Sequence, residues 1–180
     1  RRLTGHNLFF AGTGAVLETV GVEIDDALLA GWHARVERAR RHLGWDRTSP
    51  GSSLAAAIVA RRHATGASLA VQAPVDQLFT ATELNEWALC ATVFERDPVR
   101  WASVAVDLLA DYLEDANDPA DVIPPVLEEH AELARLAVRA ASERRPDVVS
   151  LIEAARARYV GHLLDEATLT LGAGKGSRSW

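Results

Sequence analysis

The sequence predicts an α+β fold, with a small mixed sheet of the split β-α-β type and a helical C-terminal half. Three observations predict it. Short β-branched and aliphatic runs fill much of the first 75 residues, apolar residues recur at three- and four-residue steps after residue 97, and another strand-like run occupies 168–171. We place a single domain at residues 1–171, with a helical insertion at about 97–166 before its last strand.

The first half begins with a strand and a helix. Residues 15–24 are strand-like, and Asp25 or Asp26 can cap the next helix, because a carboxylate accepts hydrogen bonds from the free N–H groups of a first turn. Gly44 ends this helix. Its apolar stripe comprises Leu28, Leu29, Trp32, Val36, Ala39 and Leu43, with the arginines mostly off it.

The middle of the chain predicts a hairpin and then a central helix. The apolar runs 55–64 and 67–73 are close enough for a tight turn. Thr80 and Glu83 have the spacing of a capping box, in which each side chain bonds the other's backbone N–H, so the helix begins near Thr80. It is apolar nearly all round, which predicts a place in the centre of the fold.

The second half is predicted to be helical. One helix begins at Asp97-Pro98, a second follows Pro124-Pro125 and runs to about Arg144, and a third begins at Pro146. The inner face of the third helix holds Val148, Ile152, Ala155, Tyr159 and Leu163. Residues 172–180 are rich in glycine and serine and are expected to form an exit linker.

Composition predicts a globular chain of the cell interior. Of the 180 residues, 48% are hydrophobic and 24% charged, and no apolar run is long enough to cross a bilayer, so we expect no membrane partner. The net charge of −6 repels a phosphate backbone, so we expect no nucleic acid. The start lacks an apolar signal core and there is a single cysteine, which together predict a cytoplasmic location.

We predict no catalytic residue and no metal site. The six histidines share no ligand spacing, and Cys90 lies in an apolar run, where a thiol packs as a small hydrophobe. The segment LGAGKGSRS lacks the first glycine of a phosphate-binding loop, where Leu169 stands, and Gly176 follows Lys175 in place of Ser or Thr. There is no Gly-x-Ser-x-Gly elbow. We therefore expect no cofactor in this chain.

Two titratable side chains on the later helices have two interpretations each. His130 falls on the apolar face of its helix, while three nearby glutamates fall toward the polar side, so it is either a hydrogen-bonded core histidine or part of an acid–base cluster. Arg156 also projects toward the apolar face of its helix, so its guanidinium needs either an acidic partner within the fold or a ligand carboxylate.

Charged and polar residues in three places form the predicted substrate-binding set. Arginines on the first helix and the run 61–63 on a strand make two basic patches, which are either solvated faces or docks for an acidic partner. Two polar residues at the start of the central helix are candidates for a ligand or interdomain contact. The set comprises Arg38, Arg41, Arg61, Arg62, His63, Asn85 and Glu86.

Three segments resemble cyanophycin synthetases and related Mur ligases. The opening RRLTGHNLFF is similar to the start of cyanophycin synthetases, where a Leu-x-Gly-x-Asn segment leads the first strand; here these residues are Leu3, Gly5 and Asn7. The central APVDQLFTATELNEWALCATVFE resembles a helix ahead of the nucleotide-binding modules, and TLTLGAGKGSRSW resembles the segment that leads into the Mur-type ATP-binding domain. The resemblance adds Asn7 to the predicted substrate-binding residues.

The resemblance implies a front domain without nucleotide chemistry. In that family such a domain helps to hold a peptide or polymer, while ATP-dependent modules activate a carboxylate as an acyl phosphate and form an amide bond. The Gly-x-x-Gly-Lys-Thr loop of Mur ligases and the ATP-grasp elements are absent from this sequence. ATP and magnesium are therefore expected only in separate ligase modules.

The expected function is non-catalytic positioning of an acidic peptide or polymer, or contact with adjoining ligase domains. One competing function is a self-contained interaction module that forms a homodimer through its C-terminal helices. Another is a hydrolase that uses His130 and a glutamate as its acid–base pair.

Overall fold

The structure is a computed structural model that describes residues 1–5, 7–21, 23–46, 57–96, 128–164, 168–173 and 176–179. The elements in these ranges are β1 (Arg2–Leu3), β2 (Gly14–Glu18), α1 (Asp26–His42), β3 (Ile58–His63), β4 (Gly66–Gln72), α2 (Leu78–Arg96), α6 (Glu129–Glu143), α7 (Pro146–Ala157), β5 (His162–Leu164), β6 (Leu169–Leu171) and β7 (Arg178–Ser179). The predicted α+β class is confirmed. The helix expected from Asp97 lies outside the described residues.

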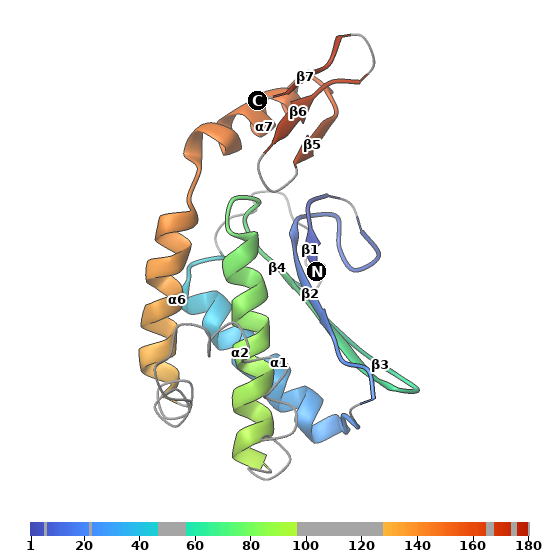
Figure 1. The fold of residues 1–180 in the computed structure, drawn as a ribbon, viewed down its shortest axis with the longest axis vertical. Coiled ribbons are helices and arrows are strands. Elements are labelled where there is room, and N and C mark those ends of the chain that lie inside the picture. Colours follow the sequence, from blue (N-terminus) through green and yellow to red (C-terminus); the bar gives the residue numbers. More distant parts are fainter. Residues whose placement is uncertain are drawn as a thin grey trace.

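The main sheet has four strands in the order β1-β2-β4-β3 (Figure 1). Both β2 and β3 pair antiparallel with β4, so they run in the same direction, and α1 connects them. This is a split β-α-β unit with β4 inserted between the parallel strands. The hairpin of β3 and β4 was predicted correctly, but its turn was not: His63 pairs with Gly66, so the turn residues are Ala64 and Thr65, one position before the expected Thr65 and Gly66.

The sheet is antiparallel throughout, where we expected a mixed sheet. The segment 168–171, which we expected as its last strand, supplies β6 to a second antiparallel sheet, β5-β6-β7. Arg178 and Ser179, which we expected within an exit linker, form β7 and pair with β6. The C-terminal strands therefore pair with one another, and the main sheet consists of the hairpins β1-β2 and β3-β4, joined by the antiparallel pairing of β2 with β4.

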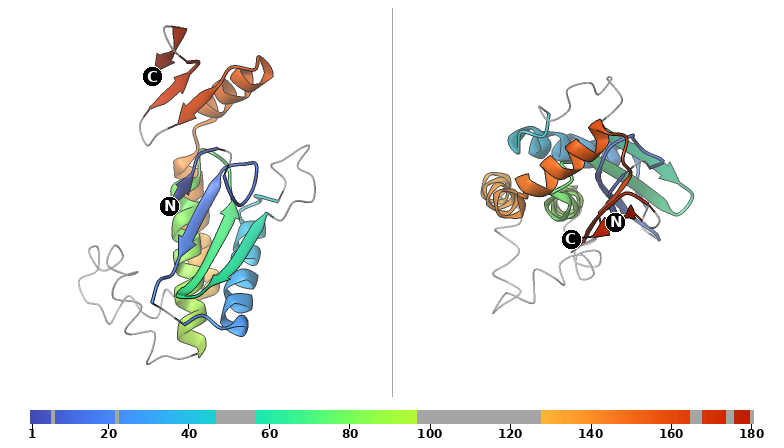
Figure 2. Two further views of the ribbon diagram at one scale, coloured as in Figure 1. Left: turned by 90° about the vertical axis from the view of Figure 1, so that its right-hand side faces the viewer. Right: turned by 90° about the horizontal axis from the view of Figure 1, so that it is seen from above.

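Three helices lie on one face of the main sheet (Figure 2). α1 and α2 pack against each other over the sheet, and α6 packs on α2 at the outside. The side chain of Asp25 caps α1 by accepting a hydrogen bond from the Leu28 backbone N–H at 2.8 Å, as predicted. The core contains Trp32 and Trp87, both nearly inaccessible to solvent, together with the apolar side of β4.

The central position of α2 was predicted correctly, but its N-terminal cap was not. The helix begins at Leu78, and its first N–H groups bond to the side chain of Glu143, at the end of α6. The two carboxylate oxygens of Glu143 accept from Phe79 N at 2.7 Å and from Thr80 N at 2.9 Å. Thr80 lies within the helix, so it does not form a capping box with Glu83.

The faces of the last two helices differ from the prediction. His130 is exposed and Glu132 is buried, the reverse of what the helical wheel predicted, because Glu132 bonds Arg135 at the α6–α2 contact. Arg156 is also exposed. Helix α7 ends at Ala157, so Leu163, expected on its inner face, lies in β5.

The main sheet with α1, α2 and α6 is called the core below, and α7 with β5, β6 and β7 is called the C-terminal unit. Figure 1 shows the C-terminal unit beyond the end of the core at which α2 begins and α6 ends. The connection is the non-helical pair Arg144 and Arg145, whose φ, ψ angles are −57°, 131° and −130°, 73°. The backbone N–H of Arg145 donates to Asp76 Oδ2 at 2.8 Å, which fixes one end of the connection to the core.

Candidate functional site

The predicted basic patch on α1 is engaged within the protein. Arg38 donates two hydrogen bonds to the carboxylate of Glu129 on α6, at 2.7 and 2.8 Å. These bonds lower the pKa of Glu129 below its ordinary value and raise the pKa of Arg38. Arg41 forms an ion pair with Glu37, one turn back along the same helix. The charges of this patch are thus largely balanced by neighbouring carboxylates.

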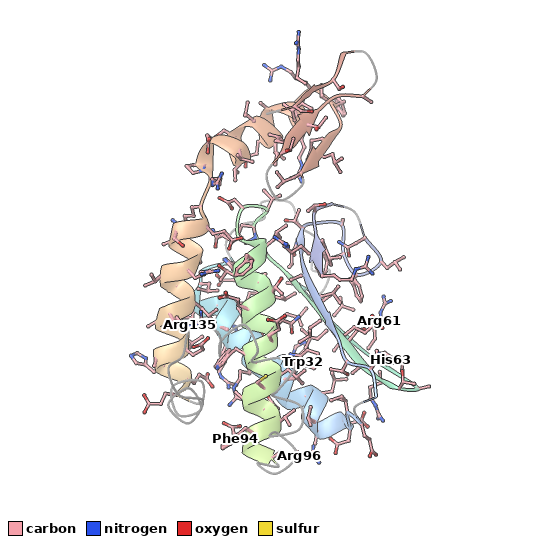
Figure 3. The ribbon with its side chains drawn as sticks, viewed as in Figure 1. Trp32, Arg61, His63, Phe94, Arg96 and Arg135 are labelled. Carbon is pink, nitrogen blue, oxygen red and sulfur yellow. The ribbon has the colours of Figure 1, made fainter. Side chains whose placement is uncertain are left out.

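The second basic patch lies on β3, at the edge of the main sheet (Figure 3). Arg61 donates to the Leu8 carbonyl oxygen at 3.1 Å, and its guanidinium carbon is 5.1 Å from the centre of the Phe9 ring. Arg62 bonds Asp26 at 2.7 Å, and His63 Nε2 is 3.7 Å from a Glu18 carboxylate oxygen. These contacts anchor the opening loop and the start of α1 to the hairpin.

Asn7 organises the loop between β1 and β2. Its Nδ2 donates to the carbonyl oxygens of Gly5 at 2.9 Å and Gly12 at 3.0 Å. Its Oδ1 accepts from Phe9 N at 2.9 Å and Phe10 N at 3.1 Å. Because all four contacts lie within the loop, the amide holds the loop in shape.

Asn85 is a buried link between α1, α2 and the sheet. Trp32 Nε1 donates to Asn85 Oδ1 at 2.9 Å, and Asn85 Nδ2 donates to the Leu69 carbonyl oxygen at 2.8 Å. The side chain is inaccessible to solvent, so its hydrogen-bonding groups face the core. Glu86, the next residue, is half-buried on α2. The structure therefore places the eight predicted binding residues in several separate locations.

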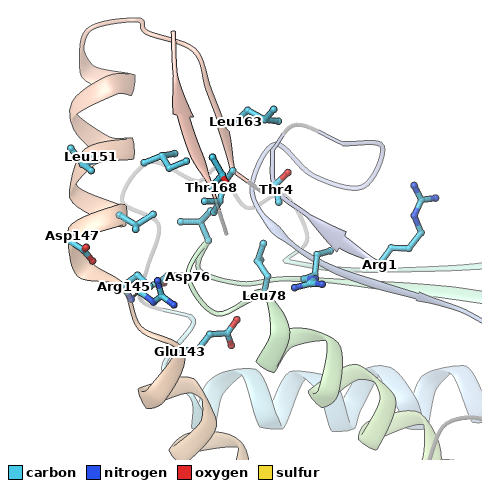
Figure 4. A pocket seen from close by; sticks show the side chains of 15 residues that line it. Arg1, Thr4, Asp76, Leu78, Glu143, Arg145, Asp147, Leu151, Leu163 and Thr168 are labelled. Atoms are coloured by element: carbon cyan, nitrogen blue, oxygen red, sulfur yellow. Dashed lines mark hydrogen bonds between the residues drawn. The ribbon is translucent and has the colours of Figure 1, made fainter. Parts of the chain in front are cut away.

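A cleft of about 1140 Å³ lies between the core and the C-terminal unit (Figure 4). Its residues come from β1, the segment before α2, the α6–α7 connection and the C-terminal unit. They are Arg1, Arg2, Thr4, Val75, Asp76, Leu78, Glu143, Arg145, Asp147, Val148, Leu151, Leu163, Leu164, Thr168 and Leu169. None of the eight predicted binding residues lines it.

The cleft combines apolar walls with charged groups at its floor. Leu78 on the core side and Leu163 on the C-terminal side bring aliphatic surface to the cleft (Figure 4). Figure 4 places Asp76, Glu143 and Arg145 close together at the junction of α6 and α7. Such a mixture suits an elongated ligand that carries both apolar and charged groups.

The charged side chains of the cleft are arginines and carboxylates, and its described lining residues include no histidine, cysteine, serine or lysine. Cys90 lies elsewhere, in the core, where burial raises its pKa to about 12. Within the described residues, no three His, Cys, Asp or Glu side chains are grouped as metal ligands.

One sequence signal for the cleft was missed. Glu143 lies in the last turn of α6, where the helix dipole disfavours a negative charge, and no basic residue accompanies it there. An acidic residue in this position indicates a partner outside its own helix, and here that partner is the first turn of α2. The remaining cleft residues come from four parts of the chain that are far apart in the sequence. The periodicity of a single helix or strand does not indicate that such parts lie side by side.

Comparison with known proteins adds no relative. No protein-family model matches the chain, and no curated protein or solved structure matches it significantly. None of the described helices is both long and apolar enough to cross a bilayer. A function is therefore inferred from the residues and their geometry.

Proposed function

We propose that this chain is a non-catalytic front domain of an ATP-dependent amide ligase of the cyanophycin-synthetase or Mur-ligase type, which positions a peptide or polymer substrate. One observation carries the proposal. Each of the three segments that resemble these ligases contributes residues to the same cleft, although the segments are far apart in the sequence. Thr4 comes from the opening segment, Leu78 from the central one and Thr168 from the closing one.

The cleft is the place for the substrate in this proposal, instead of the basic patches. Arg38 and Arg62 already bond carboxylates of the protein, so an acidic polymer would have to displace Glu129 or Asp26 to reach them. The aliphatic walls of the cleft offer contact along an extended chain without such displacement. ATP and magnesium belong to separate ligase modules, and the setting is the cytoplasm.

Peptide binding tests the proposal. Labelled, end-blocked hexapeptides that are acidic, neutral or basic are titrated by fluorescence anisotropy, and Mg-ATP by calorimetry. We expect saturable binding of at least one peptide and none of Mg-ATP. Leu163→Glu, at a 65% exposed cleft residue, should weaken peptide binding. Leu8→Glu, at an 86% exposed residue outside the cleft, should not. Binding of Mg-ATP without any peptide would overturn the proposal.

A homodimer through the C-terminal helices is the second candidate, and one observation favours it. Large apolar side chains of α6 and α7 are exposed, among them Val138 at 72% and Leu151 at 43%. If the helices associate, light scattering at micromolar concentration gives twice the chain mass of 19.4 kDa, and Val138→Asp restores the single mass. A single mass for the unaltered chain excludes this candidate at that concentration.

A further inference from the structure

In the described part of the chain, the two sheets have four edge strands, and three of these strands contain arginine. Strand β1 contains Arg2, β3 contains Arg61 and Arg62, and β7 contains Arg178. Charged side chains and prolines on an edge strand are common protections against pairing with another chain. Edge strand β5, with the sequence His-Leu-Leu, contains no proline and no permanently charged residue. It therefore lacks the protection that the other three edges have.

The open edge of β5 faces the core. Within the described residues β5 pairs only with β6, and Figures 1 and 2 show β5 as the strand of the C-terminal unit nearest the core. Leu163 and Leu164 of β5 line the cleft. His162 is partly buried, and burial lowers the pKa of its ring, so the ring is neutral at pH 7. One side of the cleft is thus an uncharged strand edge.

The hydrogen-bond pattern of β5 and β6 shows which backbone groups point to this edge. Gly172 N donates to the Gly161 carbonyl oxygen at 2.8 Å, and the next residue of β5 that bonds to β6 in this ladder is Leu163. In an antiparallel pair, bonded residues alternate with residues whose N–H and C=O groups point away from the partner strand. The N–H and C=O groups of His162 and Leu164 consequently point away from β6, to the open edge.

We propose that the cleft binds its peptide as an added β-strand, which pairs through its main chain with the open edge of β5. His162 and Leu164 each offer the peptide one N–H donor and one C=O acceptor. This inference rests on the proposed function, since it states which part of the peptide the same site recognises. The peptide backbone gives the affinity, and the charge of its side chains is secondary.

The pairing also predicts an apolar side chain at the centre of the bound peptide. The peptide residue opposite Leu163 places its side chain beside that of Leu163, which is 65% exposed. Leu78 lines the cleft on the core side. An aliphatic side chain at the central position would therefore have apolar surface on both sides.

A single peptide strand suits this edge better than a second copy of the chain. An added strand lies about 5 Å from its neighbour in a sheet, so a peptide needs only a narrow space beside β5. The opposite wall of the cleft consists of core residues, among them Thr4 and Leu78. A second copy would have to bring its whole C-terminal unit up against this wall to pair its own β5 with the edge. We therefore take a free extended peptide as the occupant.

A series of methylated peptides tests the pairing on the unaltered chain. The parent is acetyl-Ala-Ser-Ala-Leu-Ala-Ser-Ala-amide, and each other member carries one N-methyl group, which removes one backbone N–H. Methylation of either alanine beside the leucine should weaken binding about fivefold or more, because these N–H groups bond β5 when the leucine lies opposite Leu163. Methylation of the leucine, whose N–H points away from β5, should change the affinity less than about twofold. Titration calorimetry measures the affinities.

Leu164→Pro and Leu164→Ala are a matched pair of protein variants. Both lose the leucine side chain, but only proline also lacks the N–H that points to the open edge, and an edge strand tolerates proline at such a position. Leu164→Pro should bind the parent peptide about fivefold or more weakly than Leu164→Ala does. Circular dichroism checks that both variants remain folded, and the methylated peptides provide the test on the unaltered chain if they do not.

The contrary outcomes separate this inference from the proposed function. If the parent binds and N-methyl groups weaken binding equally at every position, or at none, strand addition is wrong and the positioning function remains. The same conclusion follows if Leu164→Pro and Leu164→Ala bind equally well, or if a hexapeptide binds and the parent does not. If light scattering gives twice the mass of 19.4 kDa and Leu164→Pro restores the single mass, a second copy occupies the edge and the inference is wrong. Binding of neither the parent nor any hexapeptide overturns the positioning function itself.

Discussion

Helices α1 and α7 end with the same hydrogen-bond pattern, but different residue types occupy the left-handed position that closes each helix. At the end of α1, Gly44 has φ +73°, Gly44 N bonds Arg41 O, and Trp45 N bonds Arg40 O. At the end of α7, Tyr159 has φ +56° and 99% exposure. Both are Schellman motifs, in which a left-handed residue closes the last turn. Tyrosine has a Cβ that disfavours this conformation, so α7 ends under strain.

Replacing Tyr159 by glycine should therefore stabilise α7. We expect the free energy of local opening, measured by amide hydrogen exchange in α7, to rise by about 1 kcal/mol. Tyr159→Ala is the matched control, because it removes the exposed ring and leaves the Cβ that causes the strain. A glycine variant that exchanges as fast as the alanine variant contradicts a strained helix end.

Asn85 provides a second prediction, on stability. Asn85→Leu removes the shorter of two acceptors for Trp32 Nε1, which keeps the Asn85 carbonyl oxygen at 3.2 Å, and it removes the side-chain donor to the Leu69 carbonyl oxygen. The free energy of unfolding in urea should fall by about 2–3 kcal/mol. A variant with unchanged stability but weakened peptide binding would instead support the original expectation that Asn85 contacts the substrate.

Contacts between residues close together in the sequence could be predicted, and contacts between residues far apart in the sequence could not. The cap at Asp25 and the helix end at Gly44 follow from residues a few positions away. Arg35 was expected mostly off the buried stripe, but it is buried because it reaches Thr92 and Glu95 on α2, 57 and 60 residues further on. Asn85 was misread for the same reason, since its partners on α1 and β4 are set by the packing of the elements.

Among the elements, α6 depends more than the others on charged contacts. Of its hydrophobic side chains, only Leu136 and Ala140 are buried. Its charged contacts to α1 and α2 are Arg38–Glu129, Arg35–Glu129, Arg135–Glu83, Arg139–Glu83 and the Glu143 cap of α2. The attachment of α6 should therefore respond to pH more than the packing of α1 against α2 does.

Glu129 provides the pH prediction. The hydrogen bond from Arg38 lowers its pKa in the folded state, so its carboxylate contributes stability above its ordinary pKa and loses that contribution as pH falls through the lowered value. Glu129→Gln should cost about 0.5–1 kcal/mol at pH 7, a modest figure because Arg38 is half exposed. The cost should shrink toward zero as the pH approaches about 3.

Urea denaturation at several pH values between 7 and 3 measures this difference. Glu153→Gln on α7 serves as control, because Glu153 is exposed and has no ion pair within the described residues. If the Arg38–Glu129 pair does not contribute to stability, the free energies of unfolding of Glu129→Gln and of the unaltered chain will differ by the same amount at every pH.

The helices and strands were easier to predict than the ways in which they associate. The hairpin, the central α2, the start of α7 at Pro146 and the strand at 169–171 all follow from turn residues and periodicity. The face of α6 was predicted incorrectly because its buried glutamate, Glu132, pairs with Arg135 of the same helix, which also reaches Glu83 on α2. A helical wheel assigns charged residues to solvent and has no means to include such partners.

At the scale of the whole molecule, the cleft depends on the placement of the C-terminal unit. The unit follows α6 after a two-residue connection and forms its own sheet, so it stands beside the end of the core (Figure 1). The sequence indicated the strand at 169–171 but not the sheet to which it belongs, because the glycine-rich segment after it was interpreted as a linker and not as a turn that leads into β7. The cleft therefore forms only when the core and the C-terminal unit take up their places in the tertiary structure.

Amide chemical-shift mapping by NMR is the most direct test of the central claim that this chain positions a peptide between its core and its C-terminal unit. The labelled chain is titrated with acetyl-(Asp-Ala)3-amide. We predict that the largest shifts occur at Thr4, Leu78 and Thr168, with α1 around Arg38 and Arg41 little changed. Shifts that concentrate on α1 or β3 and leave the cleft residues unmoved would contradict the claim.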